Sequence, residues 1–261
     1  MTFSDARPIR LKRFVDLPNV GDVAGQLIVE TLTGRPVQVV QDGPCGAPNL
    51  AGLGTIFGRV DRQTVIWGAG SRGKPPTHVP AAVVAVRGPL TRKVLRDHGM
   101  AQPDVLGDPG VLMPMVRPLN RSAADRLGVI PHYFDVDAPF VQRARAGGAL
   151  VINPLQPVDD YLAQLMDCGT VASSSLHGVI FAHAYGIPAA WVRLSNKPNA
   201  FKFFDYFASV GVPQREVERI GPDAPLEYAA AAAALAPNPI DPQPLLVALT
   251  QAVAMITTAD R

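Results

Sequence analysis

Short apolar runs rich in β-branched residues alternate along the first part of this chain with segments whose apolar residues recur at helical spacing. Consecutive parallel strands require a crossover between them, and that crossover is usually a helix. The alternation therefore predicts a parallel sheet with helices on both of its faces. We expect strands at 9–15, 36–41, 64–67, 82–86 and 105–106, with helices at 23–32 and 89–98.

A polar stretch rich in proline and arginine at 115–126 favours a linker, and a second alternation follows it. We expect its strands at 128–132, 149–152, 170–173 and 189–192, with helices at 140–146, 158–168 and 176–185. The predicted fold class is α/β, with two doubly wound, Rossmann-like domains at 1–117 and 118–220 that face each other across a cleft. Residues 221–261 are expected to form a helical tail that packs back on the first domain, with an alanine-rich helix up to residue 236 and a final helix at 245–256.

The balance of charge limits the partners of this chain. Its 24 Lys and Arg oppose 22 Asp and Glu, and this near-neutral balance argues against a general nucleic-acid binder, which needs a strongly basic face. Residues 1–117 hold 14 basic and 9 acidic side chains, whereas residues 118–261 hold 10 and 13. The basic first half indicates an anionic ligand or surface nearby, or else ordinary variation of surface charge.

Cysteine usage and hydropathy favour a cytoplasmic protein. Cys45 and Cys168 lie far apart and match neither a disulfide framework nor a metal-binding CxxC pair. No apolar run approaches the roughly 18 residues of a membrane span, and the start of the sequence lacks the apolar core of a signal peptide. We expect at most peripheral contact with the inner face of the membrane. No resident cofactor or metal cluster is expected, with a weakly held Mg²⁺ or Mn²⁺ left open.

The glycine-rich stretch Gly68-Ala69-Gly70-Ser71-Arg72-Gly73 matches the dinucleotide-binding fingerprint only in its glycines. That fingerprint needs a helix that opens on the glycines and an acidic residue about 20 positions later. Here Lys74-Pro75-Pro76 follows and prevents a helix, and the later region holds basic residues. The phosphate-loop pattern fails as well, because a proline replaces the hydroxyl residue that binds Mg²⁺. NAD binding and ATP hydrolysis are therefore rejected, although Gly68 and Gly70 can still line a ligand cleft at a strand end.

Three turns at the ends of expected strands carry residues suited to a ligand site. Asn19, Gly21 and Asp22 follow the first strand, where Asn or Asp caps a helix and glycine permits close approach of a ligand; a plain helix cap is the simpler interpretation. Arg87 ends a strand just before a helix N-terminus, where it would bind an anion or pair with Asp108. Asp108 is either a base facing the ligand crevice or a residue that stabilises a turn.

The most specific signal is Ser173-Ser174-Ser175-Leu176-His177-Gly178, which places three serines and a histidine where a strand passes into a helix. Serine hydroxyls and free backbone N–H groups at a helix start bind anions. His177 is a candidate acid or base, with a structural histidine as the alternative. The GxSxG elbow of serine hydrolases is absent. Lys202 lies in the aromatic run 201–207, which is typical of a core helix, and is a candidate for anion binding.

Taken in order, these stretches resemble the polysaccharide pyruvyl transferase family over about residues 10–212. The matching motifs are Asn19-Val20-Gly21-Asp22, Ile66-Trp67-Gly68-Ala69-Gly70, Val86-Arg87-Gly88-Pro89-Leu90-Thr91-Arg92, Leu106-Gly107-Asp108-Pro109, Pro131-His132-Tyr133, Ser174-Ser175-Leu176-His177-Gly178 with His183-Ala184-Tyr185-Gly186-Ile187-Pro188, and Lys202-Phe203-Phe204-Asp205-Tyr206. The resemblance implies a fold similar to the two-domain GT-B glycosyltransferases. It also implies transfer of a pyruvyl group from phosphoenolpyruvate to a sugar of an exopolysaccharide, capsule or cell-wall saccharide, as a ketal and with release of phosphate.

On this resemblance the expected catalytic residues are His177 as general acid or base, and Asp22 and Asp108 as bases or acceptor-binding residues of the facing domain. Some family members carry an arginine immediately before the Leu-His pair. Ser175 stands there in this chain, so another basic residue would have to bind the donor. The expected substrate-binding residues are Arg87, Ser174, Ser175, Asn19, Gly21, Gly68, Gly70, Arg193 and Lys202.

Two other functions remain as alternatives. A nucleotide-sugar glycosyltransferase of GT-B fold shares the two-domain architecture, but the segment after His183 offers no acidic residue for a ribose. A catalytically idle family member that acts as a membrane assembly partner is the second, and the joint presence of His177, Arg87 and Asp108 argues against it. The basic first half is compatible with a saccharide acceptor linked to a lipid pyrophosphate.

Overall fold

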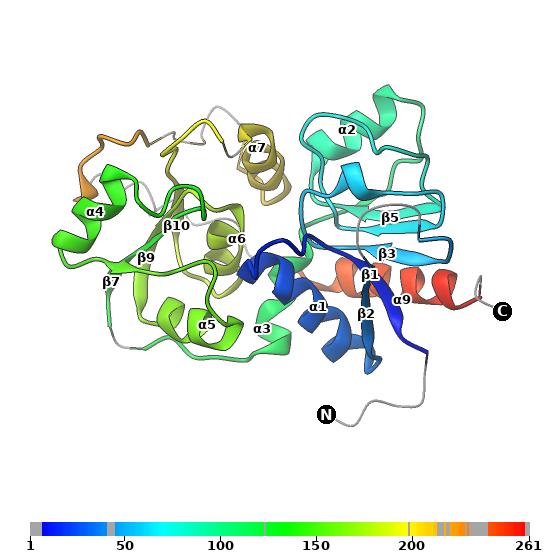
Figure 1. The fold of residues 1–261 in the computed structure, drawn as a ribbon, viewed down its shortest axis with the longest axis horizontal. Helices are drawn as coiled ribbons and strands as arrows, with labels where there is room; N and C mark the ends of the chain where they lie inside the picture. Colours follow the sequence, from blue (N-terminus) through cyan, green and yellow to red (C-terminus); the bar gives the residue numbers. More distant parts are fainter. Residues whose placement is uncertain are drawn as a thin grey trace.

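The structure is a computed structural model that describes residues 7–40, 45–122, 124–197, 199–212, 217, 220–227, 229 and 240–258. Within these residues the chain forms two parallel sheets with helices packed against them (Figure 1). The predicted α/β class is confirmed. The alanine-rich helix expected up to residue 236 lies largely outside the described residues.

The first sheet has six parallel strands in the order β2-β1-β3-β4-β5-β6. Its strands are β1 (Ile9–Lys12), β2 (Val37–Val40), β3 (Asn49–Ala51), β4 (Thr64–Trp67), β5 (Ala82–Val86) and β6 (Val105–Leu106). The direction of winding reverses between β1 and β3, which pair Leu11 with Leu50. In sheets of this kind the crevice for a ligand lies at the carboxyl ends of the strands, where the order reverses.

The second sheet has four parallel strands in the order β10-β9-β7-β8. Its strands are β7 (Arg126–Ile130), β8 (Leu150–Val151), β9 (Cys168–Ser173) and β10 (Ala189–Trp191). Here the reversal lies between β7 and β9, which run side by side from Arg126 to Ile130. This sheet therefore has its own expected ligand position, beyond the ends of β7 and β9.

Helices cover both faces of each sheet because neighbouring strand residues point to opposite faces. On the first sheet, Ile66 packs with α2 (Pro89–Asp97) and the short helix η1 (Phe57–Arg59), whereas Trp67 packs on the side of α1 (Val20–Thr33) and α9 (Gln243–Thr258). Trp67 also donates its indole N–H to the carbonyl of Leu245 at 2.8 Å. The C-terminal helix α9 therefore lies against the first sheet (Figure 1).

On the second sheet, α4 (Pro139–Ala146) packs against the face that carries Val129 and Ala172. The opposite face packs against α5 (Val158–Met166) and α6 (Leu176–Ala184). Each sheet is therefore covered by helices on both faces.

One apolar cluster joins the two sheets. It runs from Leu11 on β1 through α1 and the pair of short helices η2 (Pro109–Leu112) and α3 (Met113–Val116) to Ile180 on α6. The two sheets thus meet over a packed apolar interface. α7 (Ala200–Ser209), which follows β10 in the chain, crosses to the first sheet and packs beside α2 (Figure 1).

Most expected elements are present within a few residues of their predicted ends, and β4 (Thr64–Trp67) and β5 (Ala82–Val86) match them. The expected helix at 23–32 begins three residues earlier, because Asn19 caps it through a hydrogen bond from the Gly21 N–H. The strand β3 (Asn49–Ala51) was missed because three residues beside a glycine show no periodicity.

Candidate active site

A cavity of about 340 Å³ opens where the reversal points of the two sheets meet, and we call it the central pocket. Its walls come from segments that follow β1 and β3 in the first sheet and β7 and β9 in the second, with further residues from the glycine-rich loop after β4 and from α7. The lining residues are Phe14, Asn19, Asp22, Gly54, Thr55, Ile56, Arg59, Arg72, His132, Tyr133, Ser175, Leu176, His177 and Lys202.

The N-terminus of α1 supplies a carboxyl group to the central pocket. The side chain of Asn19 accepts a hydrogen bond from the Gly21 N–H at 3.0 Å, and so it both caps the helix and lines the pocket. Burial raises the pKa of Asp22 from 3.8 to about 7, although the nearby charges of Arg13 and Lys202 oppose this rise. A carboxyl group with this pKa is suited to give or take a proton at neutral pH.

The N-terminus of α6 supplies a histidine to the same pocket. Burial, together with the charges of Lys202 and Arg87, lowers the pKa of His177 from 6.5 to about 3. The Nε2 atom of His177 is buried without a hydrogen-bond partner among the described residues. The imidazole is therefore neutral at pH 7, and an anion beside Nε2 would raise its pKa again.

Gly21 explains how the two helix starts approach each other. A Cβ atom at this position would overlap the imidazole of His177. Only glycine lets α1 pack this closely against the ring, which also stacks on Phe181 with centroids 5.8 Å apart. Gly21 is thus a packing partner of His177 and does not itself line the pocket.

Three cationic side chains line the central pocket: Arg59 on η1, Arg72 in the glycine-rich loop and Lys202 on α7. Burial lowers the pKa of Lys202 from 10.5 to about 7, and the charges of Arg87 and Arg72 add to this effect. These cations line the same pocket as the two groups suited to proton transfer, Asp22 and His177. Such a lining is chemically suited to an anionic ligand and to proton transfer.

The second sheet adds a further histidine, His132, after β7. Burial and the charges of Lys202 and Arg72 lower the pKa of His132 from 6.5 to about 3. Its backbone N–H donates to the hydroxyl of Ser174 at 2.8 Å, and that hydroxyl donates to Asp135 at 2.7 Å. Ser174 is thus held in a hydrogen-bonded loop outside the pocket lining, whereas Ser175 lines the pocket.

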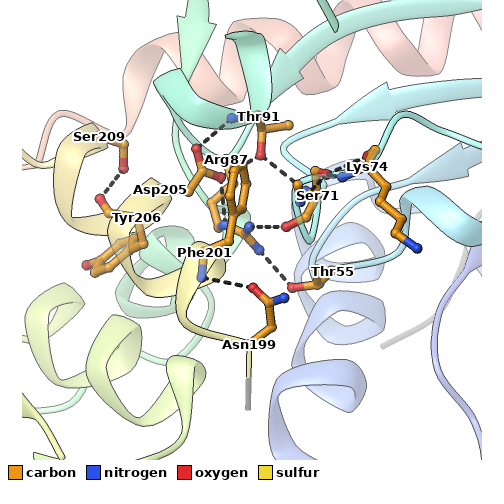
Figure 2. Close-up of polar contacts among 11 residues, drawn as sticks. Thr55, Ser71, Lys74, Arg87, Thr91, Asn199, Phe201, Asp205, Tyr206 and Ser209 are labelled. Atoms are coloured by element: carbon orange, nitrogen blue, oxygen red, sulfur yellow. Dashed lines mark hydrogen bonds and ion pairs between the residues drawn. The ribbon is translucent and has the colours of Figure 1, made fainter. Parts of the chain in front are cut away.

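Arg87 was expected to hold the donor, and the structure does not place it in the pocket. Its side chain is fully buried and forms an ion pair with Asp205 on α7, not with Asp108. Its other nitrogens donate to Thr55 Oγ1 and to the carbonyl of Ser71 (Figure 2). With the guanidinium hydrogen-bonded at all three nitrogens and closed to solvent, Arg87 is in no position to bind a ligand.

Asp108 and Arg193 also lie outside the central pocket. Asp108 is fully buried and accepts a hydrogen bond from the Gly110 N–H at 2.9 Å, which is the turn-stabilising alternative. Burial raises the pKa of Asp108 from 3.8 to about 6. Arg193 lines a separate surface groove with Gly221 and donates to Asn196 at 2.7 Å. Neither residue reaches the pocket that holds His177.

Gly68 and Gly70 shape the loop after β4 from outside the lining. A Cβ at Gly68 would overlap the ring of Pro109, and one at Gly70 would overlap the guanidinium of Arg87. The structure places both expected substrate-binding glycines at close packing contacts, outside the residues that line the central pocket.

Several lining residues were missed as candidates. His132 and Tyr133 lie in a quoted family motif, and Arg72 lies in the loop proposed to line a cleft. Arg59 had no sequence signal, because it lies on the short helix η1 that no pattern predicted. Its place in the pocket depends on how η1 packs beside Phe14, whose ring lies 5.3 Å from the Arg59 guanidinium carbon.

Fold and site together define a parallel α/β protein whose pocket, at the reversal points of its two sheets, is lined by cations, a carboxyl group and two histidines. Residues 78–196 match the family model described as polysaccharide pyruvyl transferase. The chain is also 26% identical over 180 residues to the succinoglycan biosynthesis protein ExoV of Rhizobium meliloti (strain 1021), a match that covers 64% of this chain and 55% of that protein. These two matches confirm the resemblance to the polysaccharide pyruvyl transferase family that the motifs predicted.

Two further comparisons concern proteins without an established function. An uncharacterized protein of Acanthamoeba polyphaga mimivirus is 28% identical over 230 residues, covering 82% of this chain and 78% of that protein. The crystal structure of an uncharacterized protein from Klebsiella pneumoniae matches 77% of this chain and 87% of that chain, with 11% identity and a TM-score of 0.43. A likeness at that score carries no argument.

In the part of the chain that the structure describes, no helix is long and apolar enough to cross a membrane. Among the same residues, no group of three or more His, Cys, Asp or Glu is placed to hold a metal ion.

Proposed function

We propose that this chain transfers the pyruvyl group of phosphoenolpyruvate to two hydroxyls of a saccharide, as a ketal and with release of phosphate. The observation that carries the proposal is the central pocket itself. Arg59, Arg72 and Lys202 line it together with Asp22 and His177. Phosphoenolpyruvate brings a phosphate and a carboxylate, which need cations, and its reaction needs proton transfer.

The reaction balances without an oxidant or reductant. Two acceptor hydroxyls form C–O bonds to C2 of the donor, and the bond between C2 and the phosphate oxygen breaks. One hydroxyl proton ends on the methylene carbon, which becomes a methyl group. The other leaves with phosphate. The protein must therefore deliver a proton to carbon and remove protons from the attacking hydroxyls.

Asp22 and His177 are the groups suited to these transfers. The carboxyl of Asp22, with a pKa near 7, is present in both protonation states at neutral pH. His177 is neutral in the empty pocket and becomes a better base, and then an acid, as the donor phosphate approaches Nε2. Arg72 and Lys202 hold the anionic groups of the donor, and Ser175 adds a hydroxyl at the start of α6.

We further propose that the two sheets represent the two domains of a GT-B-like enzyme, which works in the cytoplasm at the inner face of the membrane. The presence of both reversal points at one pocket supports this arrangement. The acceptor is a sugar of an exopolysaccharide, capsule or cell-wall precursor, and the excess of basic residues in the first half favours a lipid-linked, pyrophosphate-bearing form.

Calorimetric titration of the purified chain with phosphoenolpyruvate, UDP-glucose and NAD tests the donor. We expect binding of phosphoenolpyruvate alone. Arg72→Ala and Lys202→Ala should each weaken it by about 10- to 100-fold, because hydrogen bonds to charged groups contribute about 1.5–3 kcal/mol. Arg193→Ala is the matched control, because it removes a guanidinium from the separate groove. Binding of UDP-glucose in place of phosphoenolpyruvate would contradict the proposal and favour the glycosyltransferase.

A further inference from the structure

Arg87 connects three segments that are far apart in the sequence (Figure 2). It follows the last residue of β5 and donates from Nε to Asp205 Oδ2 at 3.0 Å. Its two terminal nitrogens donate to Thr55 Oγ1 at 2.9 Å and to the Ser71 carbonyl at 3.0 Å. Arg87 therefore ties α7, the loop after β3 and the glycine-rich loop to one point at the end of β5.

Thr91, in the first turn of α2, completes the same network. Its backbone N–H donates to Asp205 Oδ1 at 2.8 Å, and its hydroxyl donates to Asp205 Oδ2 at 2.6 Å. The hydroxyl also accepts a hydrogen bond from the Ser71 N–H at 3.1 Å. The fully buried carboxylate of Asp205 thus accepts three hydrogen bonds from Arg87 and Thr91.

Around the network, the backbone of α7 packs directly against the segment that joins β5 to α2. A Cβ at Gly88 would overlap the backbone of Asp205. At the N-terminal end of α7, the side chain of Asn199 donates to the Arg72 carbonyl at 3.5 Å, and the ring of Phe201 lies within van der Waals reach of a Cβ built at Gly73. α7 therefore packs closely on the first half of the chain from its N-cap to Asp205.

None of the three network side chains Arg87, Thr91 and Asp205 lines the central pocket, but their neighbours do. Lys202 precedes Asp205 by three residues and so lies near the same face of α7. Arg72, which lines the pocket, directly follows Ser71, whose carbonyl is bound by Arg87. Thr55, which also lines the pocket, accepts a hydrogen bond from Arg87 through its hydroxyl. The network thus contacts the segments that carry Lys202 and Arg72, two of the three cations that line the pocket, and the hydroxyl of Thr55.

We propose that Arg87 and Asp205 are a positioning pair that docks α7 on the first sheet and thereby holds Lys202 and Arg72 against the donor. The proposal rests on the proposed function for the identity of the donor. The placement of Lys202 stands apart from it and is measured without any substrate. A buried ion pair between elements of the two halves is then part of the machinery of the site, although it never touches a ligand.

The experiment measures the acetylation rate of Lys202 by acetic anhydride against pH, read by mass spectrometry of the Lys202 peptide. The groups around this amine are Asp22, Arg72, Arg87, His132, Asp135 and His177. In the native chain the midpoint should lie near pH 7. In Asp205→Asn we expect it at about pH 9 or above, close to an ordinary lysine, because α7 undocks and Lys202 reaches water.

The sign of this shift separates positioning from simple electrostatics. If α7 stayed docked, loss of the Asp205 carboxylate would remove a negative charge from the neighbourhood of Lys202 and lower its pKa. A midpoint at or below that of the native chain would therefore overturn the proposal. A midpoint that rises while near-ultraviolet circular dichroism stays native would support it.

Further variants test whether a rise in the acetylation midpoint of Lys202 could come from general loss of the fold. Thr91→Val keeps side-chain shape and every charge but removes the hydroxyl, and it should raise the midpoint, whereas Thr91→Ser should not. Leu249→Ala truncates a buried residue on α9, away from the network, and should keep the native midpoint at a comparable loss of Tm. If Asp205→Asn does not fold, an unchanged midpoint in Thr91→Val overturns the proposal.

The same variants separate this proposal from the donor assignment. Where phosphoenolpyruvate binds the native chain, Asp205→Asn should weaken that binding at least 10-fold, and Leu249→Ala should leave it within about 2-fold. If phosphoenolpyruvate does not bind the native chain, the proposed donor is wrong, and the acetylation result still decides the positioning role.

Discussion

At the scale of single residues, the central pocket holds ionisable groups in states that water would not favour. Asp22 is the clearest case, because burial raises its pKa to about 7 in spite of three nearby cations. Such a group lowers the stability of the fold when it is charged. The pocket thus keeps a carboxyl group at a cost to folding, as expected where a group serves chemistry.

Asp22→Asn tests this cost by its dependence on pH. The pKa of Asp22 is raised on folding, so its favourable contribution is complete below about pH 4 and is lost as pH rises towards 7. Asparagine avoids the charge, and so the gain in Tm over the native chain should grow from pH 4 to pH 8 by thermal denaturation. Asp16→Asn, at an exposed position, is the control and should change Tm little at either pH. A gain of the same size at both pH values would contradict the assignment.

At the scale of elements, the site is a meeting of two helix starts. α1 brings Asp22 and α6 brings His177, and Gly21 removes the side chain that would keep them apart. Both helices follow the strand next to a reversal point, where the first turn exposes free backbone N–H groups. The arrangement of the pocket therefore depends on how closely the two helices approach, as well as on which residues they carry.

Gly21→Ala should displace the imidazole of His177 while leaving the helix intact, because alanine favours helices more than glycine does. We expect turnover, measured as phosphate release from phosphoenolpyruvate with acceptor present, to fall about as far as in His177→Ala. That loss is roughly 100-fold or more for a group that transfers protons. Gly221→Ala is the control, since a Cβ there meets nothing. Turnover of Gly21→Ala within a few-fold of native would show that the ring position is unimportant.

At the scale of the whole molecule, one apolar core spans both sheets, and α7 and α9 both cross back to the first sheet. The chain contains two tryptophans, Trp67 on β4 and Trp191 on β10, so each sheet carries its own fluorescent probe. A shared core of this kind favours cooperative unfolding of both sheets.

Trp67→Phe leaves Trp191 as the fluorescent probe, and Trp191→Phe leaves Trp67. In urea unfolding of each variant, the fluorescence transition of the remaining tryptophan should have the same midpoint as the transition measured by circular dichroism. Ile180→Ala removes a buried side chain at the contact of α6 with η2. It should lower the free energy of unfolding reported by both probes by about 2–5 kcal/mol. Two separated transitions, with only one moved by Ile180→Ala, would instead show that the sheets unfold as independent domains.

Local patterns in the sequence predicted most of the fold, because strand and helix periodicity are properties of neighbouring residues. They predicted β4, β5 and the helices α1 and α2, and they missed β3, whose three residues are too few for a pattern. They also brought Asn19, Asp22, Ser175, His177 and Lys202 forward as candidates, since polar residues at strand ends and helix starts are unusual enough to notice. The resemblance to the polysaccharide pyruvyl transferase family followed from the order of these motifs.

Tertiary structure decided which charges face the ligand. Arg87 and Arg72 are both arginines near strand ends. Arg87 is fully buried and pairs with the carboxylate of Asp205, 118 residues away in the sequence, whereas Arg72 lines the pocket. Arg59 reaches the pocket because η1 places its guanidinium beside Phe14, in the segment that follows β1. Burial and ion pairing depend on contacts between segments distant in the chain, and a local pattern holds no information about them. The sequence by itself therefore determined most of the elements, the resemblance to the family and the chemical types of the candidate residues. Packing determined which of those residues line the central pocket and which are buried behind it.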